Sequence, residues 1–162
     1  MSNDEYIVGI EYPRPFDEYA VSLCRGAARY ICILSPALDH EAFDNSDLAD
    51  ALSALARRSR QTLIRILISD SRPLLGQGHR LLQLARRLPS TIKMRKLAEH
   101  PDWNNETVVI RDRNGVLFKP GGSEHDAFYE PDSRPATQKH LERFDELWRF
   151  SVEDPELRSL HI

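Results

Sequence analysis

The stretch LIRILISDSRPLLGQGHRLLQLARRLPSTIKMRKL (residues 63–97) sets the fold class. Leu63–Ile68 is a nearly continuous apolar run, which is typical of a strand buried on both faces. A polar loop with two glycines follows, and His79–Leu88 then carries leucines along one broad stripe, as a helix does. Thr91–Leu97 alternates apolar with basic residues, as an edge or half-exposed strand does. This order predicts a crossover unit that joins two parallel strands.

Two similar units precede this stretch. Tyr6–Tyr12 is a short β-like run that ends at a proline, which lacks an amide donor and restricts the residue before it. Asp17–Ala28 has apolar residues at helical spacing, and Tyr30–Leu34 is a continuous apolar run. Ser46 is the predicted N-cap of a further helix, which ends in two arginines where the helix dipole favours cations. Strands and helices therefore alternate through the first two-thirds of the chain.

The last third of the chain predicts a hairpin and a closing helix. Thr107–Ile110 and Val116–Phe118 flank an Asn-Gly pair, which is a strong hairpin signal. Ala127–Tyr129 reads as one more short strand, and Ala136–Val152 as a long amphipathic helix. The expected fold class is α/β, with a mixed, mostly parallel sheet and helices on both faces.

The composition indicates one globular domain over residues 1–162. Apolar residues make up 41% and charged residues 29% of the 162 positions, which suffices for one core. The net charge of −3 gives no global basic field that would draw the protein onto nucleic acid or lipid. Cys24 and Cys32 lack metal-ligand spacing and are expected to be buried thiols. Without a signal-peptide pattern or a membrane-length apolar run, we expect a cytoplasmic protein that does not contact membranes.

The order of elements resembles one repeat of the phospholipase D-like superfamily, from about residue 46 to residue 151. Three pieces carry the resemblance: Leu63–Ala85, the pair of strands in residues 92–112, and the closing helix with Leu141, Phe144 and Trp148. In that family the catalytic motif is His, any residue, Lys, four residues and Asp, on the strand before a hairpin turn. The resemblance implies half of a phospholipase D-like fold.

The same resemblance implies that the family's chemistry is missing. When the family's Asp is aligned on Asp112, Asn105 stands at the position of the catalytic His and Thr107 at that of the Lys. In the family, the His attacks phosphorus and the Lys offsets phosphate charge. Asn is no comparable nucleophile and Thr has no positive charge. We therefore interpret Asn105, Thr107 and Asp112 as a relict motif or as an ordinary strand.

A second resemblance is to uncharacterised gammaproteobacterial domains, found alone or appended to acetyltransferases of the GNAT type. The phrases DSRPLLGQGHRLLQLARRLPS (residues 70–90) and FDELWRFSVEDPELRSL (residues 144–160) carry it. It implies a bacterial source and no activity for this chain, in which we find no acetyl-CoA loop.

The predicted ligand-binding residues follow the strand that ends at Ile68. They are Asp70, Ser71, Arg72, His79 and Arg80. Ligands of parallel α/β sheets bind beyond the carboxyl ends of strands, and a helix start favours an anion. The two arginines can grip a phosphate or carboxylate with two-pronged contacts. The alternative is structural: Asp70 caps a turn and pairs with Arg72, and His79 is a satisfied helix-start residue.

A series of basic residues is a weaker candidate for a nucleic-acid surface. It consists of Arg57, Arg58, Arg60, Arg65, Arg86, Arg87, Lys93, Arg95 and Lys96. If these side chains converge on one face they can hold a phosphate backbone; otherwise they are solvated helix ends and an exposed strand face. We favour the second interpretation, because aromatic residues for base stacking are not interleaved.

The remaining motifs predict neither a metal nor a cofactor. The six histidines show no metal-ligand spacing, and no Walker loop, glycine fingerprint or serine elbow is present. Trp103 lies in a polar loop and is either an exposed contact residue or a loop anchor.

Three functions remain in competition. The first is a non-catalytic binding or regulatory module of unknown ligand, with phosphate-containing ligands as one option. The resemblance implies a homodimer with an isologous interface, with a further protein partner as an option. The second is a nuclease or phosphodiesterase with a shifted active site that uses His79 and Asp70. The third is a nucleic-acid-binding accessory domain. The sequence favours the first, without catalysis.

Overall fold

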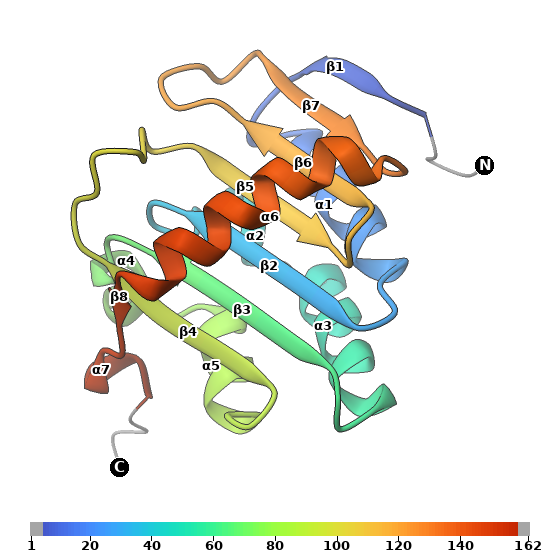
Figure 1. Cartoon of the computed structure of the whole chain (residues 1–162). Coiled ribbons are helices and arrows are strands. Elements are labelled where there is room, and N and C mark those ends of the chain that lie inside the picture. Colours follow the sequence, from blue (N-terminus) through green and yellow to red (C-terminus); the bar gives the residue numbers. More distant parts are fainter. Residues whose placement is uncertain (1–4, 159–162) are drawn as a thin grey trace.

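Within residues 5–158, which the computed structural model describes, eight strands form one sheet in the order β1-β7-β6-β5-β2-β3-β4-β8 (Figure 1). The strands are β1 (Ile7–Ile10), β2 (Tyr30–Ser35), β3 (Leu63–Ile68), β4 (Ile92–Leu97), β5 (Thr107–Arg111), β6 (Gly115–Lys119), β7 (Ala127–Glu130) and β8 (Ser151–Val152). The helices are α1 (Phe16–Arg25), α2 (His40–Phe43), α3 (Ser46–Arg58), α4 (Arg72–Gln77), α5 (Arg80–Arg87), α6 (Arg134–Arg149) and α7 (Pro155–Arg158).

The centre of the sheet is the predicted crossover unit. Strands β2, β3 and β4 run parallel, with Tyr30 opposite Leu63 and Ile64 opposite Ile92. The mixed α/β class is confirmed, but the balance within the sheet differs from expectation: two strand pairs are parallel and five are antiparallel. The reason is that the chain after β4 returns beside β2 and continues as hairpins, which need only short connections.

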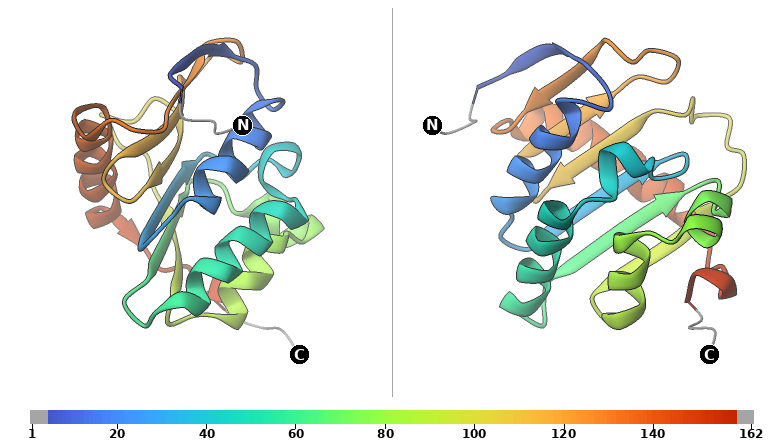
Figure 2. Two further views of the ribbon diagram at one scale, coloured as in Figure 1. Left: turned by 90° about the vertical axis from the view of Figure 1, so that its right-hand side faces the viewer. Right: turned by 180° about the vertical axis from the view of Figure 1, so that it is seen from behind.

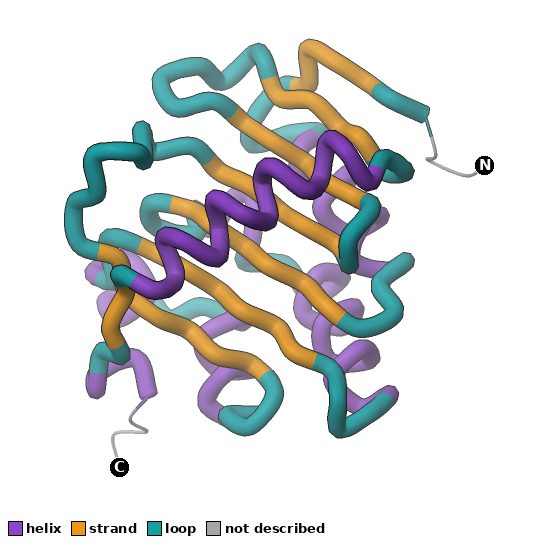
Figure 3. The backbone as a smooth tube through the Cα atoms, viewed as in Figure 1, coloured by secondary structure: helices purple, strands orange, loops and turns teal. Residues whose placement is uncertain are grey.

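Helices cover both faces of the sheet, as predicted. Helices α1, α3 and α5 lie on one face, and α6 crosses the other face diagonally (Figures 1 and 2). Figure 3 shows how α6 runs from the β6 side of the sheet toward β8. The apolar residues of α1, α3 and α5 join one core cluster, and Phe144 and Leu147 of α6 join a second. Alternate residues of the central strands therefore face two separate cores.

A partly buried arginine fastens α6 to the sheet. The guanidinium carbon of Arg65 lies 4.9 Å from the centre of the Phe144 ring, and its Nη2 lies 2.8 Å from Oδ1 of Asp145. On the same face, the guanidinium carbon of Arg95 lies 5.1 Å from the Trp148 ring centre. These two members of the basic series therefore pack under α6 instead of joining an open surface.

Several element ends differ from the sequence prediction. The N-cap of α3 is Asn45, not Ser46, because the extended Asn45 backbone lets its Oδ1 accept the N–H of Leu48 at 2.7 Å. The loop before α5 contains the short helix α4. The closing helix ends at Arg149, because Ser151 and Val152 pair with β4 as β8. No helix in the described part of the chain is long and apolar enough to cross a membrane.

Candidate ligand site at the carboxyl edge of the sheet

A hollow lies at the end of the sheet where β3 and β4 end and β5 begins, which we call the carboxyl edge. Its volume is about 820 Å³. Its lining comes from the end of β3, the end of β4 and the connection to β5: Ser69, Lys96, Leu97, Ala98, Glu99, His100, Pro101, Trp103, Asn104 and Asn105. The ends of parallel strands are the usual ligand position in such sheets.

The wall of this hollow, residues 98–106, is a loop held by its own hydrogen bonds. Trp103 is 9% exposed, and its Nε1–H donates to the carbonyl oxygen of Glu106 at 3.2 Å. Of the two roles considered for Trp103, an exposed contact residue or a loop anchor, the structure therefore shows the loop anchor. The Glu106 carboxylate accepts the N–H of Asn104 at 2.7 Å and pairs with Arg143 of α6 at 3.0 Å. The wall is therefore preorganised by a tryptophan and a nearly buried carboxylate.

A glycine on the neighbouring loop fixes where Asn104 and Asn105 lie. A Cβ on Gly121 would overlap the carbonyl oxygen of Asn104 and stand 2.9 Å from its carbonyl carbon. Asn105 itself has φ 62°, a left-handed conformation that Asn tolerates better than most residues. The backbone at Asn104 and Asn105, which line the hollow, is thus fixed by the close approach of Gly121 and by the left-handed conformation of Asn105.

The chemistry of the hollow suits an anion. Lys96 brings a positive charge from β4, His100 brings an imidazole, and Asn105 brings an exposed amide. His100 uses Nδ1 to accept the N–H of Asp102 at 3.1 Å, so its Nε2 remains available. The lining also includes the exposed carboxylate of Glu99, so an anion would bind through the ammonium group of Lys96 and the polar groups of His100 and Asn105.

A candidate metal group adjoins the hollow. Within the described residues, ligand atoms of His100, Asp102 and Glu146 lie within 4.8 Å of one another. His and carboxylates are ordinary ligands for a divalent ion. Acidic groups near the surface often gather without an ion, and Nδ1 of His100 is already engaged. We assign no metal to this group.

The predicted ligand residues form two clusters instead of one site. In the first, Nε and Nη2 of Arg72 donate to the two carboxylate oxygens of Asp70, each at 2.9 Å. These hydrogen bonds lower the pKa of Asp70 to about 2. Ser71, between them, is buried and makes no side-chain cap for α4. Asp70 and Arg72 thus satisfy each other at the surface, as the structural alternative expects.

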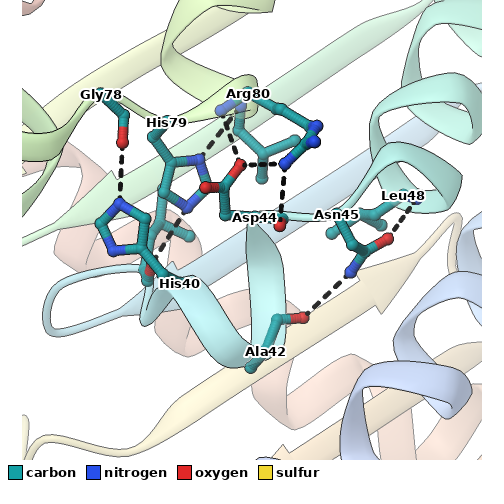
Figure 4. Close-up of polar contacts among 10 residues, drawn as sticks. His40, Ala42, Asp44, Asn45, Leu48, Gly78, His79 and Arg80 are labelled. Carbon is teal, nitrogen blue, oxygen red and sulfur yellow. Dashed lines mark hydrogen bonds and ion pairs between the residues drawn. The ribbon is translucent and has the colours of Figure 1, made fainter.

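The second cluster contains His79 and Arg80 at the start of α5 (Figure 4). His79 is 1% exposed; its Nε2–H donates to the Leu38 carbonyl at 3.0 Å, and its Nδ1 accepts the N–H of Leu81 at 3.1 Å. Arg80 contacts the Asp44 carboxylate at 3.2 Å. Burial lowers the pKa of His79, which is the neutral N-cap of α5. Both ring nitrogens of His79 are therefore occupied by the backbone.

The three positions matched to the phospholipase D motif also lie apart. Asn105 lines the hollow, whereas Thr107 is 2% exposed and is not among the lining residues. Asp112 lies at the opposite end of β5, where it accepts the backbone N–H groups of Ala28, Arg29 and Tyr30 at 2.8–2.9 Å. In this chain Asp112 therefore fixes a loop, and Asn105 alone of the three faces the hollow.

Comparison with known proteins places the chain in a family. A family model described as Domain of unknown function (DUF7931) matches residues 12–160. The chain belongs to this family. No curated protein matches the sequence. The remaining comparison for this DUF7931 domain is with solved structures.

Three solved structures share the fold. Nuc from Salmonella typhimurium, a phospholipase D family member, is 18% identical with a TM-score of 0.66 over 93% of this chain and 99% of its own. NucT from Helicobacter pylori is 15% identical with a TM-score of 0.64 over 93% and 98%. The archaeal chromatin protein TrmBL2 is 13% identical with a TM-score of 0.68 over 94% of this chain. The chain spans 56% of the length of TrmBL2. The phospholipase D-like fold is thus confirmed for the DUF7931 domain.

Sequence reasoning missed the residues that face the hollow. In the sequence, Lys96 stands out only as one of a basic series, and His100 only as one of six histidines. The signal that could have found them is their position in the chain. Lys96 is the penultimate residue of β4, and His100 lies in the loop that follows β4, at the carboxyl edge. In the DUF7931 domain the end of β4 thus contributes Lys96 to the candidate hollow, and Asp70 and Arg72 in the neighbouring loop pair with each other.

Proposed function

We propose that this chain is a non-catalytic phospholipase D-like binding module whose carboxyl-edge hollow takes a phosphate-containing ligand. The observation that carries the proposal is the joint lining of the hollow by Lys96, His100 and Asn105. The ammonium group attracts the anion, and the amide and imidazole supply hydrogen bonds that orient it. At the matched motif positions, Asn105 and Thr107 supply neither a nucleophile nor a charge.

Titration with inorganic phosphate, followed by backbone amide chemical shifts, tests this proposal. We expect saturable shifts at residues 96–105 in the wild type, and a loss of affinity of at least about tenfold in Lys96→Gln, because one charge-assisted contact is removed. Lys93→Gln, an exposed lysine at the other end of the same strand and outside the lining of the hollow, is the matched control and should give the same shifts at residues 96–105 as the wild type. Shifts that are absent, or that are equal in both variants, would count against the hollow.

A phosphodiesterase is the second candidate, and His100 is the residue that favours it. A shifted active site based on His79 loses support because both nitrogens of that ring bond to the backbone. His100 uses Nδ1 for a backbone hydrogen bond and lines the same hollow as Lys96, and an imidazole with a cation is the pair that nucleophilic attack on phosphorus requires. Hydrolysis of bis(p-nitrophenyl) phosphate by the wild type, abolished in His100→Ala, would replace our proposal with this one. We expect no hydrolysis.

We also propose that two copies associate about a two-fold axis in the cytoplasm. Closed two-fold dimers are the commonest assembly of soluble proteins. The buried, unpaired thiols of Cys24 and Cys32 suit a reducing compartment, and burial raises the pKa of Cys32 to about 11. Sedimentation velocity at micromolar concentration should give the mass of a dimer. A stable monomer there would remove the dimer from the proposal.

A further inference from the structure

The opposite edge of the sheet, where β2, β3 and β4 begin, carries a row of exposed cations. We call it the amino edge. Its exposed basic side chains come from helix ends, strand starts and the β5–β6 turn: Arg29, Arg57, Arg58, Arg60, Arg87, Lys93, Arg113 and Arg134. Figure 1 shows the ends of α3 and α5 and the starts of β3 and β4 together along this edge. The row is independent of the hollow at the carboxyl edge.

These cations have no acidic partner within 4.0 Å, unlike seven arginines elsewhere in the described part of the chain. Elsewhere, Arg14, Arg25, Arg65, Arg72, Arg80, Arg143 and Arg158 each lie within 4.0 Å of a carboxylate oxygen. Within residues 5–158, no amino-edge cation makes an ion pair. Arg58 instead donates to the carbonyl of Ala27 at 2.9 Å, and Lys93 to that of Pro89 at 2.6 Å. Their charge is therefore not neutralised locally, although the chain as a whole is acidic.

One end of the row surrounds a hollow of about 390 Å³. Arg29, Arg113 and Arg134 line it, together with Tyr30, which is 37% exposed. The carboxylate of Asp112 also lines it, but both its oxygens already accept backbone N–H groups. Three arginines and an aromatic ring thus line a hollow whose acidic lining residue, Asp112, already accepts hydrogen bonds from backbone N–H groups. Guanidinium groups bind phosphate well, and a half-exposed ring can stack on a base.

The row is continuous across the strands. The bond from Arg58 to Ala27 places Arg58 next to Ala28 of the hollow, and the N–H of Leu63 donates to the carbonyl of Arg29 at 3.1 Å. From β5 through β2 and β3 to β4 are three strand spacings, or about 15 Å. A duplex carries one charge per roughly 1.7 Å of its axis, so several phosphates fit along this distance.

From these observations we infer that the amino edge binds the phosphate backbone of nucleic acid without reading sequence. The row contains more cations than one phosphate group can contact, which argues against a small anion as the ligand. A membrane is disfavoured because, apart from Tyr30, the large exposed apolar side chains lie near β1 and β8 and not along this row. The inferred row also revises the basic series of the sequence. Arg65 and Arg95 lie under α6, and Lys96 lies at the carboxyl edge. Arg86 is not in the row either, because it donates to the backbone carbonyls of Glu156 and Leu157.

Fluorescence anisotropy with short labelled nucleic acids of unrelated sequences tests the inference. Duplex DNA, single-stranded DNA and duplex RNA serve as separate probes. We expect wild-type binding that is similar between sequences and falls steeply between about 50 and 200 mM salt. The variants Arg57→Gln/Arg60→Gln/Arg87→Gln and Arg29→Gln/Arg113→Gln/Arg134→Gln should each lower the slope of log affinity against log salt. The expected decrease is about one for each arginine that pairs with a phosphate in the wild type.

The control variant removes three cations elsewhere: Arg14→Gln/Lys139→Gln/Arg149→Gln has the same net charge as each test variant. It should bind nearly as the wild type does, and Lys96→Gln should as well. Equal weakening in control and test variants would show a mere net-charge effect and overturn the inference. Loss of binding in Lys96→Gln alone would move the contact to the carboxyl edge, which refutes the inference and leaves the proposed function standing. Binding to anionic vesicles without binding to nucleic acid would also overturn it.

Discussion

The carboxylate of Asp112 accepts the backbone N–H of Tyr30 at 2.9 Å and so joins the β5–β6 turn to the first residue of β2. The same side chain accepts the N–H of Arg29 at 2.8 Å and of Ala28 at 2.9 Å. Asp112 has φ 50°, a conformation in which Asp is more frequent than most residues. One acid therefore sets both a hairpin turn and the entry of the chain into the central strand.

Removing this acid should destabilise the protein. Asp112→Ala leaves three backbone donors without their charged partner, and we expect a loss of about 2–3 kcal/mol in the free energy of unfolding. Denaturant titration measures it. Asp50→Ala, at an exposed position of α3, is the control and should change stability by less than about 0.5 kcal/mol. Equal stabilities of the two variants would contradict the role given to Asp112.

The sequence predicted most of the helices and strands, but not how the strands are ordered in the sheet. Leu63–Ile68 is β3 with the predicted ends, because a buried apolar run leaves a strand few alternatives. The Asn-Gly signal found the hairpin, but the positive φ is at Asp112, because Arg111 pairs with Gly115 across a longer turn. The antiparallel return of β5 beside β2 could not be predicted, since periodicity within a strand does not specify its neighbour.

The contacts of the candidate site residues are hardest to predict where a side chain's partner is distant in sequence. The pairing of Asp70 with Arg72 is local, so the sequence alone suggests it. One partner of His79 is not local: Leu38 lies 41 residues away, and nothing in the helix pattern indicates it. Likewise, the hollow beside Lys96 depends on a loop that is positioned by Gly121.

The close approach of Gly121 to Asn104 should make that glycine irreplaceable. Gly121→Ala places a Cβ against a backbone carbonyl that cannot rotate away, so we expect a loss of roughly 1–3 kcal/mol and altered amide shifts at residues 103–106. Gly76→Ala, where a Cβ meets nothing within 4 Å, is the control; in α4 alanine should be neutral or slightly stabilising. A tolerated Gly121→Ala would mean that the wall of the carboxyl-edge hollow moves freely.

His79 should act as a helix cap and not as a reactive group. His79→Ala removes both the cap of α5 and the bond to Leu38, for an expected loss of about 2–3 kcal/mol. His79→Asn keeps a good capping residue and should recover part of that loss, as thermal unfolding can show. Phosphate affinity at the carboxyl edge should be unchanged in His79→Asn. The opposite pattern, a stable His79→Ala with weakened phosphate binding, would return His79 to the ligand site.

Mild acid should weaken the fold through His140. Its ring lies 4.9 Å from that of Phe118, and its buried Nε2 has no partner within the described residues. Burial, followed by the nearby Lys139 and Arg143, lowers the pKa of His140 from 6.5 to about 4. The unfolded chain therefore takes up a proton first as the pH falls. The contribution of neutral His140 is complete above pH 6.5 and is lost progressively between pH 6.5 and 4, by at most about 1.4 kcal/mol per pH unit.

The variant His140→Phe isolates this effect. Phenylalanine suits the aromatic contacts with Phe118 and Phe128 and cannot titrate. Stability measured by urea titration across this range should fall less steeply in the variant than in the wild type. Because the pKa of His79 is also lowered, some dependence on pH should remain. Identical slopes would show that His140 takes up its proton at the same pH in the folded and the unfolded chain.

The two outermost strands limit how copies of this protein can assemble. Strand β8 has two residues, and β1 has four with a register irregularity and a left-handed Gly9. Neither offers the long, flat row of free amides that templates a further strand. A further strand would find few free backbone amides on β1 or β8, so a stable association between copies must rely on contacts between side chains.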